Sequence, residues 1–406
     1  MSKQNQSYVG PLIIIGLLFF VFGFVTWVNG TLITFFKKAF SLDNTSSYLV
    51  TFAFFISYTV MAIPSSEVLK RTGFKRGMSL GLVIMAVGTL IFIPAAQIAS
   101  YPLFLVGLFT IGIGLTLLQT ASNPYATILG PRESAAQRIS FMGIANKMAG
   151  IFSQRLFGGL LLAGGAAATP QEELQKVELP YMILTGVLVV LAGVIWFSKG
   201  LPDVSEEQED TDGKAIKVQH NSVFSFPNLV LGVIALFCYV GVEVISGDTI
   251  INYGVSLGFS EAEASTFGTY TLWSMLAAYV LGIILIPKYV SQNLCLQISA
   301  ILGIVGTILA VTTGGFTSVL SIAFLGFANA LVWPAMWPLA LDGLGKFTKT
   351  GSALLIMGIS GGAILPLVYG NIADSIHSTQ QAYWMMMPLY LFILYYAFIG
   401  YKKRSW

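Results

Sequence analysis

The chain has 406 residues, of which 55% are hydrophobic and 10% are charged, and its mean hydropathy is +0.79. Soluble domains carry about 25% charged residues, so this composition excludes a protein that faces water on all sides. The formal net charge of +3 reflects the lysines and arginines of a few loops and does not indicate a nucleic-acid partner.

Long apolar runs fill the chain almost from end to end. A bilayer core about 30 Å thick needs about 20 apolar residues per helix. Twelve such runs lie at residues 11–36, 47–68, 77–96, 102–129, 139–165, 180–198, 227–252, 264–287, 293–313, 316–342, 351–371 and 381–400. They do not alternate in polarity, which excludes transmembrane β-strands. The sequence therefore predicts an all-α polytopic membrane protein with twelve transmembrane helices, the first too long for a signal peptide and so retained.

Lysine and arginine in the short loops predict the orientation in the membrane. The loop after the second run carries four of them, Lys70, Arg71, Lys75 and Arg76. Later even-numbered loops and the C-terminal tail are also rich in cations, and the odd-numbered loops are poorer. We therefore expect both termini in the cytoplasm, in a multi-pass protein of the bacterial inner membrane. The expected partner is the lipid bilayer, and the expected state is a monomer.

One polar stretch divides the chain into two halves. It contains a dense group of acids, namely Glu206, Glu207, Glu209, Asp210 and Asp212. Such a composition is solvated better than it packs. We therefore expect an N-terminal six-helix bundle at residues 1–200, a cytoplasmic linker at residues 201–226 and a C-terminal six-helix bundle at residues 227–406.

The two halves match each other at a near-constant offset. Asn29-Gly30 of the first run aligns with Ser246-Gly247 of the seventh, 217 residues later, and Met142-Gly-Ile144 recurs as Met357-Gly-Ile359, 215 residues later. Transporters built from parallel repeats place their substrate between the repeats, near the middle of the membrane. The offset therefore predicts a 6+6 architecture with a pseudo-two-fold axis along the membrane normal and a central substrate site.

Four motifs carry a resemblance to a known family. They are Phe22-Gly-Phe-Val-Thr-Trp-Val-Asn-Gly30, Gln119-Thr-Ala-Ser-Asn-Pro124, Leu129-Gly-Pro131 and Phe237-Cys-Tyr-Val-Gly241. With these motifs the chain resembles the fucose:proton symporter family of the major facilitator superfamily, and within it the glucose/galactose branch, over nearly its whole length. The resemblance implies import of a monosaccharide such as L-fucose, galactose or glucose, coupled to a proton or a sodium ion.

The chain departs from this family at two acidic positions. Fucose symporters carry one acid in the first helix, where this chain has Gly30, and one in the fourth helix, where it has Gln119. The superfamily's loop motif after the second helix is only partly present, because Lys70 stands at its acidic position. Other groups must therefore carry the coupling ion.

Amide side chains mark one face of the fourth helix. Gln119, Ser122 and Asn123 follow the spacing i, i+3 and i+4, which places them on one face, beside Pro124. An amide donates and accepts hydrogen bonds at once, as sugar hydroxyls require. We predict that Gln119 and Asn123 bind the sugar. The alternative is hydrogen bonding between helices.

A matching stripe lies on the tenth helix. Asn329, Trp333 and Trp337 follow the spacing i, i+4 and i+8. An indole can cover the apolar C–H face of a pyranose while the sugar hydroxyls remain free to bond. The repeat alignment places Trp333 opposite Gln119, so these two residues are expected to approach one substrate from opposite halves.

Three further residues are predicted sugar contacts, Trp27 and Asn29 in the first helix and Trp273 in the eighth. Tryptophan also anchors helices at the membrane interface, which is the alternative for both tryptophans. For the Asn29 region the alternative is plain packing, because the neighbouring Gly30 permits close helix contact.

Four charged residues lie away from the ends of the apolar runs, namely Lys147, Arg155, Glu243 and Asp248, and we assign no role to Arg155. An unpaired charge at mid-bilayer costs about 2.5–3.5 kcal/mol or more, so Lys147 needs an acidic partner. We predict Glu243 as the principal coupling acid, Asp248 as the second and Lys147 as the partner of one of them. Both acids face one cavity only if the helix breaks near Gly247.

Other interpretations of these charges stay open. Lys147 could form a purely structural ion pair, and Asp248 could lie at the outer mouth. The coupling ion could also be sodium, bound by a carboxylate and by backbone carbonyls at a break near Gly247.

The sequence holds no motif for catalysis, nucleotide hydrolysis or metal binding. Cys238 and Cys295 lie in apolar runs, as packing residues do. We expect no enzyme, no metal and no cofactor beyond a coupling proton or sodium ion. The predicted function is a secondary active transporter that imports a monosaccharide by alternating access. The alternatives are an exporter of drugs or other small solutes and, from another class, a sugar sensor or a transferase.

Overall fold

The computed structural model describes residues 9–128, 135–162, 169–198, 222–286, 289–344, 347–404 and 406, and within these ranges the chain is helical and contains no strand. Ten stretches of the described chain are long and apolar enough to cross a membrane. One of them, α4 (Leu49–Gln97), is two helices joined at a sharp kink, where Gly73 has φ 74° and ψ 169°. A further long helix is α6 (Ala135–Phe157). The twelve predicted crossings are therefore confirmed.

The first six crossings pack mainly against one another. They are α1 (Val9–Trp27) with α2 (Asn29–Ala39), the two arms of α4, α5 (Tyr101–Ile128), α6 with the π-helical turn η2 (Gly158–Leu162), and α8 (Glu178–Phe197). Two short helices, α3 (Asn44–Ser47) and α7 (Pro170–Gln175), lie between crossings. These bounds agree with the predicted runs to within a few residues, because run length reports directly on the thickness of the hydrocarbon core.

The last six crossings repeat this arrangement. They are α9 (Pro227–Asp248) with α10 (Ile250–Ser256), α12 (Phe267–Leu285), α13 (Gln292–Thr312), α14 (Gly315–Ala330) with α15 (Val332–Leu341), α16 (Thr348–Gly358) with α17 (Gly361–Ser375), and α19 (Met386–Phe398). The short helices α11 (Glu261–Ala264) and α18 (Thr379–Ala382) connect neighbouring crossings.

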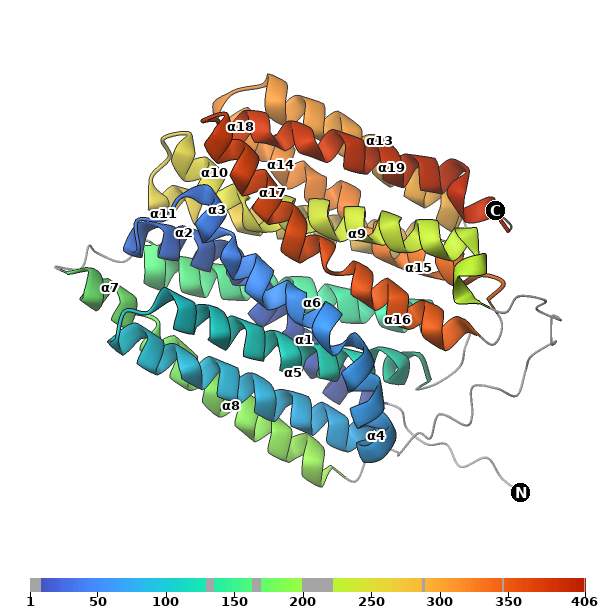
Figure 1. Ribbon diagram of the computed structural model, residues 1–406, viewed down its shortest axis with the longest axis horizontal. Helices are drawn as coiled ribbons and strands as arrows, with labels where there is room; N and C mark the ends of the chain where they lie inside the picture. The colour runs from blue at the N-terminus through green and yellow to red at the C-terminus, as the bar shows by residue number, and fades with distance from the viewer. Residues whose placement is uncertain are drawn as a thin grey trace.

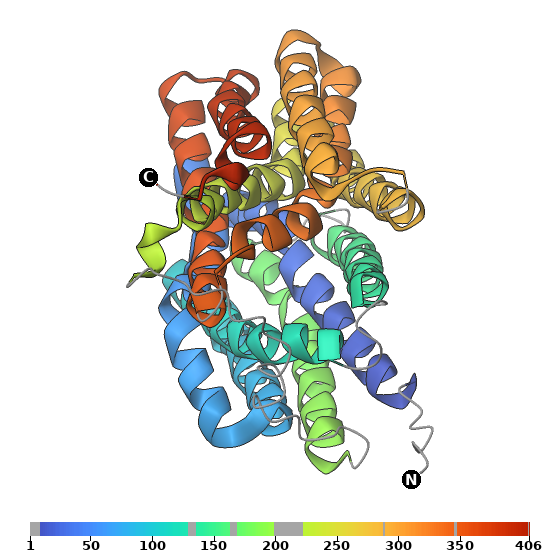
Figure 2. The same ribbon diagram turned by 90° about the vertical axis from the view of Figure 1, so that its right-hand side faces the viewer.

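The two sets of helices lie side by side (Figure 1). The blue-to-green helices α1 to α8 occupy one side of the molecule and the yellow-to-red helices α9 to α19 the other, and both termini emerge at the same end. Figure 2 looks onto that end. We call it the terminal end, and the other the distal end. Contacts between the sets run from α4 to α16 and α17, from α6 to α12, and from α2 to α9 and α10.

Several crossings are interrupted along their length. α1 and α2 meet at Val28, α9 and α10 at Thr249, and α14 and α15 at Leu331. A break leaves backbone groups without helical partners. Inside a membrane such a break is tolerated only where it is buried in protein or lines a cavity. The breaks therefore point to the interior of the molecule.

A polar clasp joins the two sets at the distal end. The Asp374 carboxylate on α17 accepts hydrogen bonds from the backbone amide (3.1 Å) and side-chain amide (2.7 Å) of Asn44, and from the backbone amide (2.8 Å) and hydroxyl (2.6 Å) of Thr45. These amides belong to the first turn of α3, whose orphan N–H groups favour an anion. Asn252 of α10 adds bonds to Asn44 and to the Tyr48 hydroxyl. The clasp, defined as Asn44, Thr45 and Asp374, joins α3 of the first set to α17 of the second.

Candidate functional site

Gln119 of α5 and Trp333 of α15 line one narrow space between the two sets of helices. The residues that complete it are Tyr58, Thr116, Thr120, Ile356 and Ile359. Its volume of about 10 Å³ is close to that of one water molecule's probe sphere. The expected placement of Gln119 opposite Trp333 is thus present, and the space is too small for any molecule larger than water.

Sequence spacing could have indicated part of this lining. Thr116 lies three residues before Gln119 and so shares its helical face. Its hydroxyl donates to the carbonyl of Gly112 at 2.8 Å, which leaves the oxygen lone pairs to accept another bond. Tyr58 carries no such signal, because its position depends on how α4 packs against the opposite half.

Two tryptophans form a stacked pair at the space. The rings of Trp333 and Trp337 lie 5.1 Å apart at an interplanar angle of 24°. Tyr239 of α9 approaches Trp333 at 6.5 Å. Trp337 therefore covers one face of Trp333 and stiffens it, as expected for an aromatic stripe at helical spacing.

Asn329 is not at this space. It is fully buried in the second half, where its amide nitrogen donates to the Ser246 hydroxyl at 3.3 Å and its oxygen accepts from the Tyr390 hydroxyl at 2.8 Å. Both ends of the amide are thus used within one half. Asn329 therefore packs inside the second half, and of the predicted stripe it is Trp333 that lines the space at Gln119.

Trp273 lies on the outer surface, which corrects its assignment to the sugar site. It is 52% exposed and shares one stripe of α12 with other exposed apolar side chains, among them Val280, Leu281 and Ile284. A continuous apolar stripe on the outside of a membrane helix faces lipid. The alternative role, an anchor in the membrane, fits this position.

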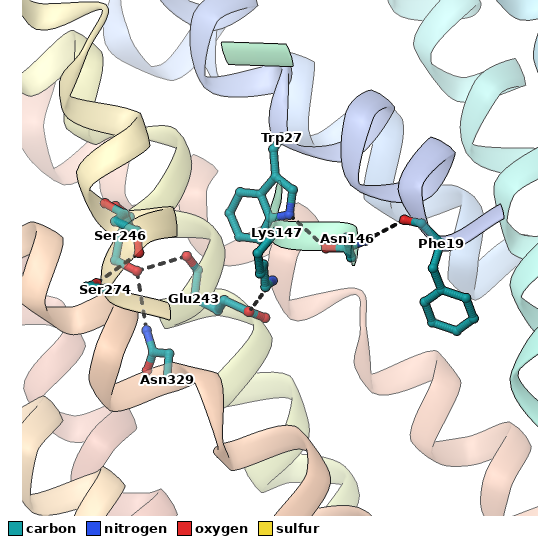
Figure 3. Close-up of polar contacts among 9 residues, drawn as sticks. Phe19, Trp27, Asn146, Lys147, Glu243, Ser246, Ser274 and Asn329 are labelled. Carbon is teal, nitrogen blue, oxygen red and sulfur yellow. Dashed lines mark hydrogen bonds and ion pairs between the residues drawn. The ribbon is translucent and has the colours of Figure 1, made fainter. Parts of the chain in front are cut away.

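Trp27 is enclosed by protein on several sides. It is 5% exposed, its indole N–H donates to the Asn146 side-chain oxygen at 3.1 Å, and the Lys147 ammonium lies 4.1 Å from its ring centroid (Figure 3). The ring also packs on Gly247, whose missing side chain makes room for it. The structure therefore places Trp27 as the partner of Lys147 and away from the space at Gln119.

Lys147 of α6 pairs with Glu243 of α9 across the two halves. The ammonium nitrogen and the carboxylate oxygen lie 3.4 Å apart, and the two side chains are only 8% and 14% exposed (Figure 3). The expected acidic partner of Lys147 is therefore Glu243. Asn146, next to the lysine, donates to the carbonyl of Phe19 at 3.4 Å and so ties α6 to α1.

Asp248 and Asn29 occupy the place where the first and seventh crossings break. Asp248 is the last residue of α9 and is 1% exposed, and Asn29 is the first residue of α2 and is fully buried. Asp248 lies one helical turn before Asn252, which bonds Asn44 of the clasp, and the alternative that Asp248 lies at the outer mouth stays a prediction. α9 runs straight through Gly247 and ends one residue later, so the break occurs close to the predicted position. The side chain of Asn123 lies outside the described residues.

A second hollow lies against α16. It has a volume of about 310 Å³ and is lined mostly by apolar side chains of α9 and α16, with hydroxyls from Thr59 and Ser360. Met357 and Gly358 line it, and the neighbouring Ile356 and Ile359 line the space at Gln119. The C-terminal turn of α16 thus lies between the apolar hollow of about 310 Å³ and the small space at Gln119.

Twelve crossings in two bundles, with a polar space between them, define a polytopic membrane transporter. The chain belongs to the Major Facilitator Superfamily, whose family model matches residues 15–366. It is 35% identical to a glucose/galactose transporter of Brucella abortus, over 99% of this chain and 97% of the relative. It is 27% identical to the L-fucose-proton symporter of Escherichia coli, over 100% of this chain and 95% of the relative.

A solved structure agrees with this membership. The crystal structure of FucP, a major facilitator transporter in the outward conformation, superposes with a TM-score of 0.73 at 26% identity, over 96% of this chain and 98% of that chain. The predicted major facilitator architecture is therefore confirmed.

Proposed function

We propose that this chain imports a monosaccharide of the glucose, galactose or fucose type together with a cation, by alternating access. The observation that carries the proposal is the shared space of Gln119 and Trp333, one from each half. An amide that donates and accepts, opposite an indole, matches the hydroxyls and the C–H face of a pyranose. The names of the curated relatives support the same substrate class.

The binding chemistry follows from what the lining residues leave free. Trp337 already covers one face of Trp333, so a single indole face remains for the sugar. Gln119 supplies two donors and an acceptor, and the Thr116 hydroxyl keeps its acceptor capacity. A drug exporter would instead favour a roomy apolar cavity. The space at Gln119 is not one, whereas the separate hollow against α16 is large and mostly apolar, so the transport assay must separate the two functions.

Transport requires the two halves to move as bodies. We assign residues 1–200 and 227–406 to these bodies and residues 201–226 to the linker. The cations of the even-numbered loops support a cytoplasmic terminal end in a bacterial inner membrane, with the chain acting as a monomer. The distal clasp then faces outside, so the described conformation is closed to the outside.

Coupling requires a group that responds to a cation. Lys147, Glu243 and Asp248 are the charged residues that lie buried where the halves meet. A cation that binds one conformation better than the other shifts the equilibrium by its differential affinity. The cation gradient can therefore drive accumulation of the sugar, without an enzymatic step.

The sugar site is tested by binding in detergent. A panel of monosaccharides in a thermal-shift assay first identifies the ligand. We expect Gln119→Ala and Trp333→Ala each to weaken its binding about tenfold or more, which corresponds to about 1.4 kcal/mol. Trp273→Ala is the matched control, because its side chain faces lipid, and it should bind normally. Native affinity in both site variants, with native melting, would show that these residues only pack.

Transport itself is tested in proteoliposomes. Labelled sugar should accumulate when a cation gradient is imposed, and it should exchange by counterflow without one. Absence of sugar uptake, together with extrusion of hydrophobic dyes, would favour the exporter.

A further inference from the structure

Two helices, one from each half, are interrupted where they meet. α1 ends at Trp27 and α2 begins at Asn29, while α9 ends at Asp248 and α10 begins at Ile250. Under the repeat offset of 217, the second break lies about one helical turn beyond the first. Interrupted helices at related positions of two repeats are where transporters expose backbone carbonyls to coupling ions.

The buried polar atoms at these breaks lack partners. Asp248 is 1% exposed, and neither of its carboxylate oxygens has a hydrogen-bond partner among the described residues. The amide of Gly30 faces this carboxylate but lies outside hydrogen-bond geometry. Asn29 is fully buried, and both ends of its amide are likewise unpartnered in the described chain. Buried polar groups are almost always satisfied. The unpartnered carboxylate of Asp248 and the unpartnered amide of Asn29, next to the close contact of Gly30 with Asp248, therefore indicate a ligand.

The missing side chain of Gly30 leaves room, called the cradle below, beside the backbone of Asp248. A Cβ atom built on it would lie 3.1 Å from the Asp248 Cα, 3.2 Å from the Asp248 carbonyl oxygen and 3.4 Å from the Gly247 carbonyl oxygen. At the break, the backbone amide of Thr249 donates to the carbonyl of Ile245. In the described residues, no backbone amide beyond the break donates to the carbonyl of Gly247 or Asp248. The carbonyl oxygens of Gly247 and Asp248 therefore face the gap that Gly30 leaves open.

The charges in this region do not balance. Lys147 already pairs with Glu243 at 3.4 Å, with the indole of Trp27 over its ammonium. Asp248 then remains as a buried carboxylate with no direct cationic partner among the described residues. An isolated buried charge is strongly unfavourable. Either a proton on the carboxyl or one bound monovalent cation removes this charge, and the neighbouring carbonyl oxygens of Gly247 and Asp248 favour the cation.

We propose that one sodium ion binds here, held by the Asp248 carboxylate, the backbone carbonyls of Gly247 and Asp248, and the side-chain oxygen of Asn29. Every donor is an oxygen atom, the ligand type that hard cations take. The inference rests on the proposed cation-coupled transport and names its ion. It also moves the principal coupling role from Glu243 to Asp248, because Glu243 is already paired with Lys147.

The placement of this site accounts for coupling. Asn29 and Gly30 belong to the first half, and Gly247 and Asp248 to the second. When the halves rock apart at the distal end, these ligands separate and the affinity for sodium falls. Trp27 packs on Gly247, and the Lys147 ammonium makes a cation–π contact with its ring. The Trp27 side chain therefore contacts both the sodium site and the ion pair between the halves. Sodium therefore stabilises one conformation over the other.

The test measures sodium binding without sugar, so that it does not depend on the transported substrate. Purified full-length protein in detergent is titrated with radiolabelled Na⁺, and its melting temperature is compared in NaCl and in choline chloride at one pH and ionic strength. We expect saturable binding and stabilisation by sodium. Asp248→Asn should weaken binding about tenfold or more, and Gly30→Ala should also weaken it, because the added Cβ fills the cradle without removing a charge.

Asp342→Asn is the matched control, because Asp342 is an exposed acid that bonds Arg404 at the terminal end, and it should bind sodium normally. Native sodium affinity in folded Asp248→Asn would overturn the site. Absence of sodium binding in the native protein, with uptake driven by a proton gradient and lost in Asp248→Asn, would overturn the choice of ion. If sodium binds through Asp248 but no monosaccharide binds or moves, the sodium site stands and the proposed sugar transport fails.

Discussion

At the scale of single residues, the ion pair of Lys147 and Glu243 links the two halves near the centre of the molecule. Both side chains are largely buried, and the Trp27 indole adds a cation–π contact to the ammonium. A buried pair repays its desolvation only while both partners are present. The ion pair therefore stabilises the described arrangement of the halves, and an arrangement that leaves either charge buried alone is destabilised.

Removal of one partner should destabilise the protein more than removal of both. We expect Lys147→Met to lower stability by about 3–5 kcal/mol, because it strands the Glu243 carboxylate. The double variant Lys147→Met with Glu243→Gln should regain most of this loss. Thermal unfolding of purified protein in detergent measures both. Lys38→Met is the control, because the Lys38 pair with Glu261 is exposed and such pairs contribute little. Equal melting of the single and double variants would contradict this account.

Glu243 also permits a test of coupling separate from stability. We expect Asp248→Asn to abolish gradient-driven accumulation and Glu243→Gln only to reduce it, because Glu243 is paired with Lys147 and does not bind the ion. Counterflow exchange of sugar should continue in both variants, because exchange needs the rocking motion without net movement of the ion. Accumulation and counterflow are measured in the same proteoliposomes. Accumulation at the native level in Glu243→Gln would place coupling wholly at Asp248.

At the scale of elements, the clasp joins a four-residue helix of one half, α3, to a membrane crossing of the other half, α17. α3 is a helix of four residues capped by Asp43, and its first amides point toward α17. The Asp374 carboxylate there accepts four hydrogen bonds from Asn44 and Thr45. Charge-assisted bonds of this kind contribute about 1.5–3 kcal/mol. The clasp therefore holds α3 of one half against α17 of the other.

Loss of the Asp374 charge should open the distal end. We expect Asp374→Asn to increase the outward-open population about tenfold, equivalent to about 1.4 kcal/mol. The measurement is the rate at which an impermeant thiol reagent, added from outside, modifies Thr116→Cys in the space at Gln119. Cys238 and Cys295 are buried and should give a low background. Asp342→Asn is the control, and an unchanged labelling rate in Asp374→Asn would mean that the clasp does not gate.

At the scale of the whole molecule, α6 and α12 form a long seam between the two halves. Glycines of α6 and of the following turn η2 let α12 and its neighbours approach closely. A Cβ on Gly143 would lie 3.2 Å from the Tyr279 ring, and one on Gly158 would lie 3.1 Å from the Ser265 side chain. Between them, a Cβ on Gly150 would lie 2.7 Å from Trp27 and 3.0 Å from Leu272. Small residues at helix contacts are typical of membrane proteins. In the proposed alternating access, one half would turn against the other along this seam.

A bulky side chain in the seam should stop the motion. We expect Gly150→Leu to abolish both counterflow and accumulation, because its side chain meets Trp27 and Leu272 at once. Gly186→Leu on α8 is the matched control, since nothing lies within 4 Å of its Cβ position. Sugar exchange in proteoliposomes measures the motion without the gradient. Native exchange in a correctly inserted Gly150→Leu variant would show that the halves do not turn on this seam.

The sequence by itself determined the crossings, the repeat and the set of buried charges. Each crossing follows from run length against the thickness of the bilayer, and each polar residue inside a run stands out because hydrocarbon penalises it. Both are local properties of the chain. The pairing of Trp333 with Gln119 was also within reach, because the repeat offset relates the two halves.

The tertiary structure alone decided which polar side chains meet. Lys147 pairs with Glu243 across 96 residues of chain. Asp248 therefore has no direct cationic partner among the described residues and lies at the helix break beside Gly30. Packing between distant segments also decides that Trp273 faces lipid and that Asp374 bonds α3. It likewise decides that the Asn329 amide bonds Ser246 and Tyr390. Helical spacing gives the face of a residue but not its neighbour, because the neighbour depends on how separate helices pack and where each of them breaks.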